Sequence, residues 1–332
     1  MTSFQLPSTI FPDNAITRAE LSYQIRSSKK LRPWRRWITR IAAGLLVMVS
    51  LIAFVGLMIA SLSQRDPTPL IASFEPLPLL LILVAIVYAV YLMLQTISLT
   101  ANSITREIEA ETWEMLVLTG INARQIVRGK WWATVQRQFS RYLLLSLIRI
   151  GATVAYVFSV GGSAFYVSKS YYTSFQLPHP VTLFIAALFG ILFSIASLAL
   201  SAACGVMASA VSKRSSIAIL RAFVLQIVIT VFPALLLSIP FLPYLSTAEV
   251  SAAGSIFQSI IWGIASVIDN GFNLIASPLL LNTQSNSTHI IPVTFDWMIA
   301  ALLSLCLYTL LIWFALWRAE KRAVRALATS AD

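Results

Sequence analysis

Charged side chains are scarce in this chain of 332 residues: Asp, Glu, Lys and Arg make up only 11%, and hydrophobic residues make up 58%. A soluble domain carries about 25% charged residues and uses them to cover its surface. The composition therefore excludes an ordinary soluble domain and predicts an integral membrane protein. The net charge of +11 does not indicate a nucleic-acid partner, because nearly all basic residues lie between apolar runs, where they indicate membrane topology.

Cysteine and histidine are equally rare, with two of each. Cys204 and Cys306 lie inside apolar runs, which predicts packed core residues rather than a disulfide or a metal site. His179 and His289 stand alone in loops, so we expect neither to act as a base or a ligand. We expect no catalytic residue, cofactor or metal in this chain.

A phosphate-binding loop is also absent from the sequence. Such a loop needs the pattern Gly-x-x-x-x-Gly-Lys-Ser/Thr, whose backbone amides and lysine hold the phosphates. Gly129 and Lys130 come closest, but Arg124 occupies the position of the first glycine and Trp131 follows the lysine. The chain is therefore not expected to hydrolyse ATP or to be an enzyme.

Six apolar runs have the length of a membrane span. A helix needs roughly 20 apolar residues to cross a hydrocarbon core of about 30 Å. The sequence predicts an all-α fold with six transmembrane helices over residues 37–62, 77–100, 141–167, 181–211, 216–241 and 295–317. They form a membrane domain, 37–317, between an N-terminal tail, 1–36, and a basic C-terminal tail, 318–332.

Basic residues lie on one side of these spans. Of the 24 Lys and Arg residues, 20 are in the two tails, in the second and fourth loops, or at the adjoining span ends. Because cytoplasmic loops retain Lys and Arg, both termini and these two loops are expected in the cytoplasm. We predict a multi-pass protein of the cell membrane.

A further apolar stretch, residues 255–281, is divided by the sequence Asp-Asn-Gly at 269–271. Each half is too short to span, and a seventh crossing would place the basic C-terminal tail outside. We therefore predict a re-entrant or interfacial helical hairpin on the outer side, before the last span.

The N-terminal tail predicts an interfacial helix over residues 14–37. Ile16, Leu21 and Ile25 form a broken apolar stripe, and Trp34 and Trp37 stand at the end of a Lys/Arg cluster. Tryptophan favours the headgroup level and basic clusters attract anionic lipid, so a membrane anchor is expected. Contact with a protein partner is the alternative.

The second loop, residues 103–132, predicts a helix, a tight turn and a second helix. Four glutamates lie among apolar residues in its first half, namely Glu107, Glu109, Glu111 and Glu114. Gly120 predicts a C-cap, and Asn122 with Gln125 predicts the N-cap and capping box of the second helix. Arg124, Arg128 and Lys130 make that second helix basic. The loop is either a docking surface or a solvated loop that its charges keep out of lipid.

The same loop carries a resemblance to a known family. Its acidic cluster, Thr112, aromatic-acidic pair, aliphatic block 115–118, turn and Gly129-Lys130 resemble the membrane subunit of a type 2 ABC exporter. Glu111 and Gly120 depart from that pattern, which usually has Gly and Pro there. In the N-terminal tail, Asn14, Glu20-Leu21 and Arg26 resemble the family's surface connecting helix.

The resemblance implies a function as a permease. The loop would be a coupling helix that enters a cleft of separate ABC ATPase subunits, which bind the ATP and Mg. A second permease subunit, identical or different, would complete the membrane part, and transport would be export. The residues implied in the ATPase contact are Glu107, Glu111, Thr112, Trp113, Glu114, Leu116, Gly120, Arg124 and Lys130.

Two arginines lie within the spans, where a charge is costly and often functional. Arg149 and Arg221 are within about two turns of a predicted cytoplasmic end, so we expect their side chains to extend to the headgroups. A place in a substrate pathway or subunit interface is the alternative, together with the polar residues Gln95 and Gln226.

Other functions stay open from the sequence. A non-transporting membrane scaffold or sensor would use the same loop to recruit a soluble partner without ATPase motifs. An ion-coupled carrier is less favoured, because no central membrane carboxylate is present to carry the ion. The apolar spans do not identify a substrate.

Overall fold

The computed structural model describes residues 15–27, 33–63, 77–110, 112, 121–167, 180–212, 214–238 and 293–328. These residues form helices and, within these ranges, no strand, which confirms the all-α prediction. The helices are α1 (Ala15–Ser27), α2 (Pro33–Ser63), α4 (Leu77–Glu109), α6 (Ala123–Val167), α7 (Pro180–Val211), α8 (Ser215–Ser238) and α12 (Val293–Ala328).

Each predicted span overlaps a helix, and the fifth, 216–241, is described only to Ser238. Among the described residues, three helical segments have the length and hydropathy of a membrane span, namely Leu83–Glu109, Leu183–Val211 and Ala301–Val324. Two shorter apolar segments, Ile41–Gly56 and Ser215–Ile229, lie in α2 and α8. The chain thus has the helices of a membrane protein, while its six crossings and their orientation stay predictions.

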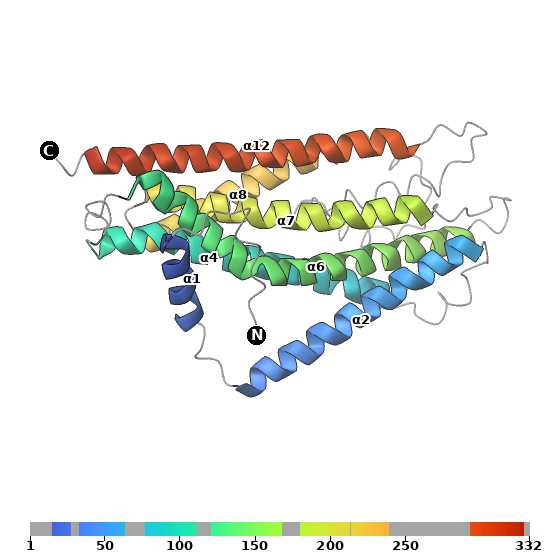
Figure 1. Ribbon diagram of the computed structural model, residues 1–332. Helices are drawn as coiled ribbons and strands as arrows, with labels where there is room; N and C mark the ends of the chain where they lie inside the picture. The colour runs from blue at the N-terminus through green and yellow to red at the C-terminus, as the bar shows by residue number, and fades with distance from the viewer. Residues whose placement is uncertain are drawn as a thin grey trace.

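Helix α7 is the centre of the bundle and packs against α2, α4, α6, α8 and α12. Figure 1 shows α4, α6, α7 and α12 extended along a common direction. Small side chains let helices approach closely. Gly205 of α7 is the clearest example, since a Cβ there would lie 1.8 Å from the Oγ1 of Thr100 on α4. The adjacent Cys204 is buried, which confirms its prediction as a core residue. Cys306 is exposed, so the same prediction is wrong for that residue.

Both ends of the second loop belong to the helices that flank it. Helix α4 runs past the predicted span end at residue 100 to Glu109, and α6 extends without a break from Ala123 to Val167. Helix α12 likewise continues beyond residue 317 to Ala328, so it includes most of the predicted C-terminal tail. The predicted outer hairpin, 255–281, lies outside the described residues, as do His179 and His289.

Candidate functional site

Three helices meet in a charged junction where the second loop leaves the bundle. Helix α1 runs across the long axis of the bundle and packs on α6 beside α4 (Figure 1). The residues in this junction come from α1 (Thr17, Glu20, Tyr23, Gln24), α4 (Ser103 through its carbonyl, Arg106, Glu107) and α6 (Lys130, Thr134, Arg137). We call this set the charged junction.

Lys130 is at the centre of the charged junction and is only 1% exposed. Its ammonium pairs with the carboxylate of Glu107 and donates to the backbone carbonyl of Ser103, both on α4. The second carboxylate, Oε2 of Glu20, lies 4.0 Å from the Lys130 Nζ. Burial lowers the pKa of Lys130, and the carboxylates of Glu107 and Glu20 oppose that shift by favouring its charged form.

Glu20 joins α1 to both neighbouring helices. Its Oε2 lies 3.6 Å from the Nη2 of Arg106, whose guanidinium also covers the ring of Tyr23 at 3.9 Å. Its other oxygen accepts a hydrogen bond of 3.1 Å from Gln24, and Gln24 also donates to the hydroxyl of Thr134 on α6. A buried charge needs such partners, because an unpaired carboxylate in a low-dielectric interior is strongly destabilising.

The face that α1 buries is polar. Thr17, Glu20 and Gln24 are all buried and, at spacings of three and four residues, lie on one side of the helix. The predicted apolar stripe is only partly buried: Ile16 is inside, but Ile25 is exposed. Sequence reasoning followed the apolar periodicity and missed this polar face. The spacing of the three polar residues was the available signal.

Two side chains of the loop cap the N-termini of helices α6 and α8. Asn122 is the N-cap of α6, since its Oδ1 accepts from the backbone amide of Arg124 at 3.1 Å, and this confirms the predicted cap. At the end of α4, Oε1 of Glu109 accepts from the backbone amide of Ser215, the first residue of α8, at 2.9 Å. A carboxylate at a helix N-terminus is favourable because it meets unpaired amides and the positive end of the helix dipole.

The residues predicted to contact an ATPase separate into three groups. Glu107 and Lys130 face each other inside the chain, so the structure does not present Lys130 to a partner, contrary to the predicted direct contact. Arg124 and Thr112 are exposed, and Thr112 donates to the carbonyl of Glu107. The rest of the set lies outside the described residues: Glu111, Trp113, Glu114, Leu116 and Gly120.

The two arginines of the predicted spans, Arg149 and Arg221, differ in burial. Arg221 is exposed and donates to the hydroxyl of Ser212, just beyond the end of α7. The extension of its side chain to the headgroups stays a prediction. Arg149 is 3% exposed and donates to Ser194 on α7 at 2.7 Å. Ser194 is about 25 Å along the helix from Val211, the predicted cytoplasmic end. The expected extension of Arg149 to the headgroups is therefore wrong.

The two glutamines of the predicted pathway are also placed. Gln95 on α4 accepts a hydrogen bond from Arg141 on α6, and Gln226 is buried on α8. Arg149 donates to Ser194 on α7, and Arg221 of α8 donates to Ser212, just beyond the end of α7. The role of these four residues in a pathway or subunit interface stays a prediction. Within the described ranges, no group of three His, Cys, Asp or Glu residues could hold a metal.

Comparison with known proteins finds no family model and no curated protein that matches this chain. The family resemblance of the second loop therefore rests on its own residues.

Proposed function

We propose that this chain is the permease subunit of an ATP-driven transporter of the type 2 ABC exporter class. One observation carries the proposal: α6 is an uninterrupted helix from Ala123, in the coupling-like loop, to Val167, at the far end of the predicted third span. A continuous helix transmits a displacement of its first turn along its whole length. A partner that moved the loop would therefore move the membrane part of α6.

The charged junction supports this role because it makes the loop part of a rigid unit. Lys130 and Glu107 join α6 to α4, and Glu20 adds α1 through Arg106. The Ser209 hydroxyl of α7 also accepts from the backbone amides of Ile104 on α4 and the adjacent residue, each at 3.0 Å. Motion imposed on the loop would pass to all four helices together instead of bending one of them.

The proposal assigns different roles to the loop residues. Glu111, Trp113, Glu114 and Leu116 would contact the ATPase, with Trp113 and Leu116 filling its cleft and the glutamates meeting basic residues. Arg124 and Thr112, which are exposed, would join this contact. Glu107 and Lys130 would hold the loop in position from within. ATP and Mg would bind to the ATPase, and a second permease subunit, identical or different, would form the route for export.

Copurification tests the proposal. The tagged full chain is solubilised from its own cells, and the bound proteins are sequenced. We expect a protein that contains Gly-x-x-x-x-Gly-Lys-Ser/Thr, and we expect Glu111→Arg with Trp113→Ala to reduce its recovery about tenfold, because reversing a charge and removing an aromatic anchor both weaken an interface. Asp332→Arg, which reverses a charge in the C-terminal tail, is the matched control.

The same experiment separates the rival function. A non-transporting scaffold or sensor would retain a partner that lacks the phosphate-binding pattern. If such a partner is recovered, and if Glu111→Arg with Trp113→Ala reduces its recovery, the scaffold function would replace the permease proposal. Recovery of an ATPase that is insensitive to both substitutions would overturn the role of the loop.

A further inference from the structure

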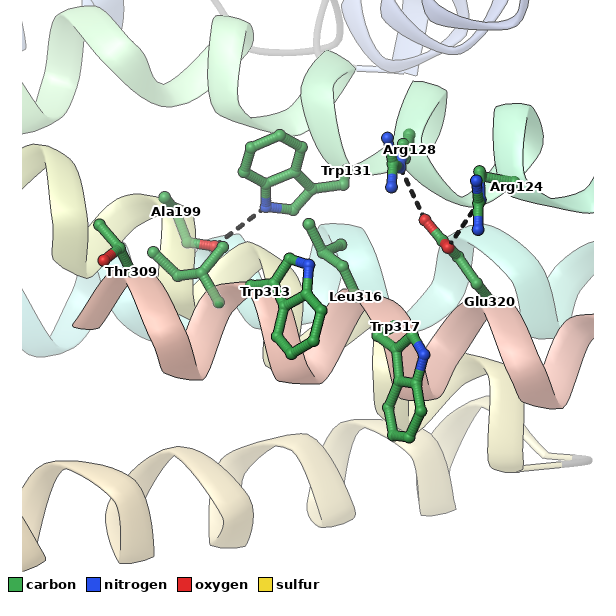
Figure 2. A pocket seen from close by; sticks show the side chains of 10 residues that line it. Arg124, Arg128, Trp131, Ala199, Thr309, Trp313, Leu316, Trp317 and Glu320 are labelled. Carbon is green, nitrogen blue, oxygen red and sulfur yellow. Dashed lines mark hydrogen bonds and ion pairs between the residues drawn. The ribbon is translucent and has the colours of Figure 1, made fainter. Parts of the chain in front are cut away.

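A groove lies between α6, α7 and α12, beside the charged junction and separate from it. It has a volume of about 460 Å³, within the range of small-molecule sites. Its lining is largely apolar along its length, with Trp131, Ile312, Trp313 and Leu316 among the wall residues, and it is charged at one end, where Arg124, Arg128 and Glu320 meet. Figure 2 shows the two arginines of α6 directed toward the carboxylate on α12.

The charged end has an excess of positive charge. Arg124 and Arg128 each use Nε to bond one oxygen of Glu320, at 3.0 and 2.6 Å. Within the part of the chain that the structure describes, no residue bonds their terminal Nη nitrogens, and the two side chains are 62% and 57% exposed. Two guanidinium groups against one carboxylate leave a net charge of +1 on two largely exposed side chains. Guanidinium binds phosphate through such paired donors.

The apolar part of the groove opens to the outside of the bundle. Trp313 is 61% exposed, and its ring stacks on Trp317 at 6.3 Å. Trp131 forms the inner wall and donates its indole N–H to the carbonyl of Ala199 at 3.0 Å (Figure 2). Lys321 covers the ring of Trp317 at 3.9 Å. Tryptophan beside Lys and Arg at the end of an apolar helix is typical of the headgroup level.

We infer that this groove binds one anionic phospholipid, with the phosphate on the terminal nitrogens of Arg124 and Arg128 and an acyl chain along Trp131 and Leu316. The charge, the apolar slot and the tryptophans each match one part of that molecule. The inference rests on the membrane placement of the helices and requires no ATPase partner. Glu320 limits the affinity, because it shares the two arginines with the phosphate.

The test titrates the purified full chain in detergent with phosphatidylglycerol and, separately, with phosphatidylcholine of the same acyl chains. Native mass spectrometry gives the apparent Kd of the first bound lipid. We expect phosphatidylglycerol to bind more tightly and Arg124→Gln with Arg128→Gln to weaken it about tenfold, since two charge-assisted bonds are lost. Arg322→Gln, an exposed arginine on α12 outside the groove, is the matched control and should leave the Kd unchanged.

Two further variants keep the test decisive if the double arginine variant is unstable. Glu320→Gln should tighten phosphatidylglycerol binding, because it frees both arginines; a purely structural ion pair would give no gain. Thr309→Trp, at an exposed wall position, should fill the slot and weaken lipid binding about tenfold with the arginines intact.

Three results would overturn the inference. Equal affinity for the two lipids would show that the chain does not select an anionic headgroup. Unchanged binding in the double arginine variant would show that the lipid does not bind at Arg124 and Arg128. If Thr309→Trp altered the oligomeric mass and left lipid binding unchanged, the groove would be an interface with a second copy. None of these results depends on whether an ATPase copurifies, so this inference and the proposed function can fail separately.

Discussion

The ammonium of Lys130 on α6 and the carboxylate of Glu107 on α4 form a buried ion pair, although the loop between them has the composition of a solvated segment. Glu20 of α1 lies 4.0 Å from the same ammonium. The pair thus connects α4 and α6, the two helices that flank the loop. Helix α1 joins them through Glu20.

Removal of Lys130 alone should be strongly destabilising. Lys130→Met leaves Glu107, whose side chain is only 15% exposed, without its cation, and breaking one side of a buried ion pair costs about 3–5 kcal/mol. The double change Lys130→Met with Glu107→Leu should cost less than the single change, because it leaves no unpaired charge at this point. The measurement is the free energy of unfolding in detergent, and equal losses in the two variants would contradict the arrangement.

The bond between Arg149 and Ser194 predicts an asymmetry between two buried serines. Ser194→Ala removes an acceptor from a buried guanidinium and should cost about 1–3 kcal/mol of unfolding free energy. Ser146 is equally buried, but its hydroxyl donates to the carbonyl of Leu143 in its own helix, so Ser146→Ala should change stability by less than about 0.5 kcal/mol. Unfolding of the two variants in parallel decides the point, and a similar cost for both would argue against the role of Arg149.

The close approach of α7 to α4 makes Gly205 intolerant of a side chain. A methyl group there would overlap Thr100, whose β-branched side chain has little freedom, so Gly205→Ala should destabilise by about 1–3 kcal/mol. Gly44 on α2 has nothing within 4 Å of the same added atom. Gly44→Ala should stabilise by about 0.5–1 kcal/mol through helix propensity. Midpoints of thermal unfolding should move in opposite directions, and a shift of the same sign would refute this contact.

The N-cap of α6 gives a smaller effect at the loop itself. Asn122→Ala should cost about 1 kcal/mol, because the amide of Arg124 loses its acceptor, whereas Asn122→Ser should retain most of the stability. Proteolysis within the loop reports the change, since a frayed first turn is cleaved faster. Identical cleavage rates for the alanine and serine variants would speak against the cap.

The sequence predicted the helices well, because long apolar runs and an Asn cap are local signals. It failed where the partners are distant in the chain. Glu20 was not recognised as buried, since its cation Arg106 lies on another helix and hydrophobic periodicity carries no information on polar pairing. Lys130 was assigned to the basic face of the loop's second helix for the same reason. Arg149 and Arg221 each lie near a predicted cytoplasmic end of a span, so the sequence predicted the same environment for both. The packing of α6 on α7 buries Arg149, whereas Arg221 is exposed.

The most direct test of the permease proposal is ATP hydrolysis by the complex in lipid vesicles. The wild-type chain with its copurified ATPase is compared with the variant that carries Glu111→Arg and Trp113→Ala, at equal amounts of ATPase and with Asp332→Arg as the control. We predict that the double variant lowers hydrolysis to the rate of the ATPase alone while the control matches wild type. Hydrolysis at the wild-type rate in the double variant would contradict the proposal that this loop couples the chain to an ATPase.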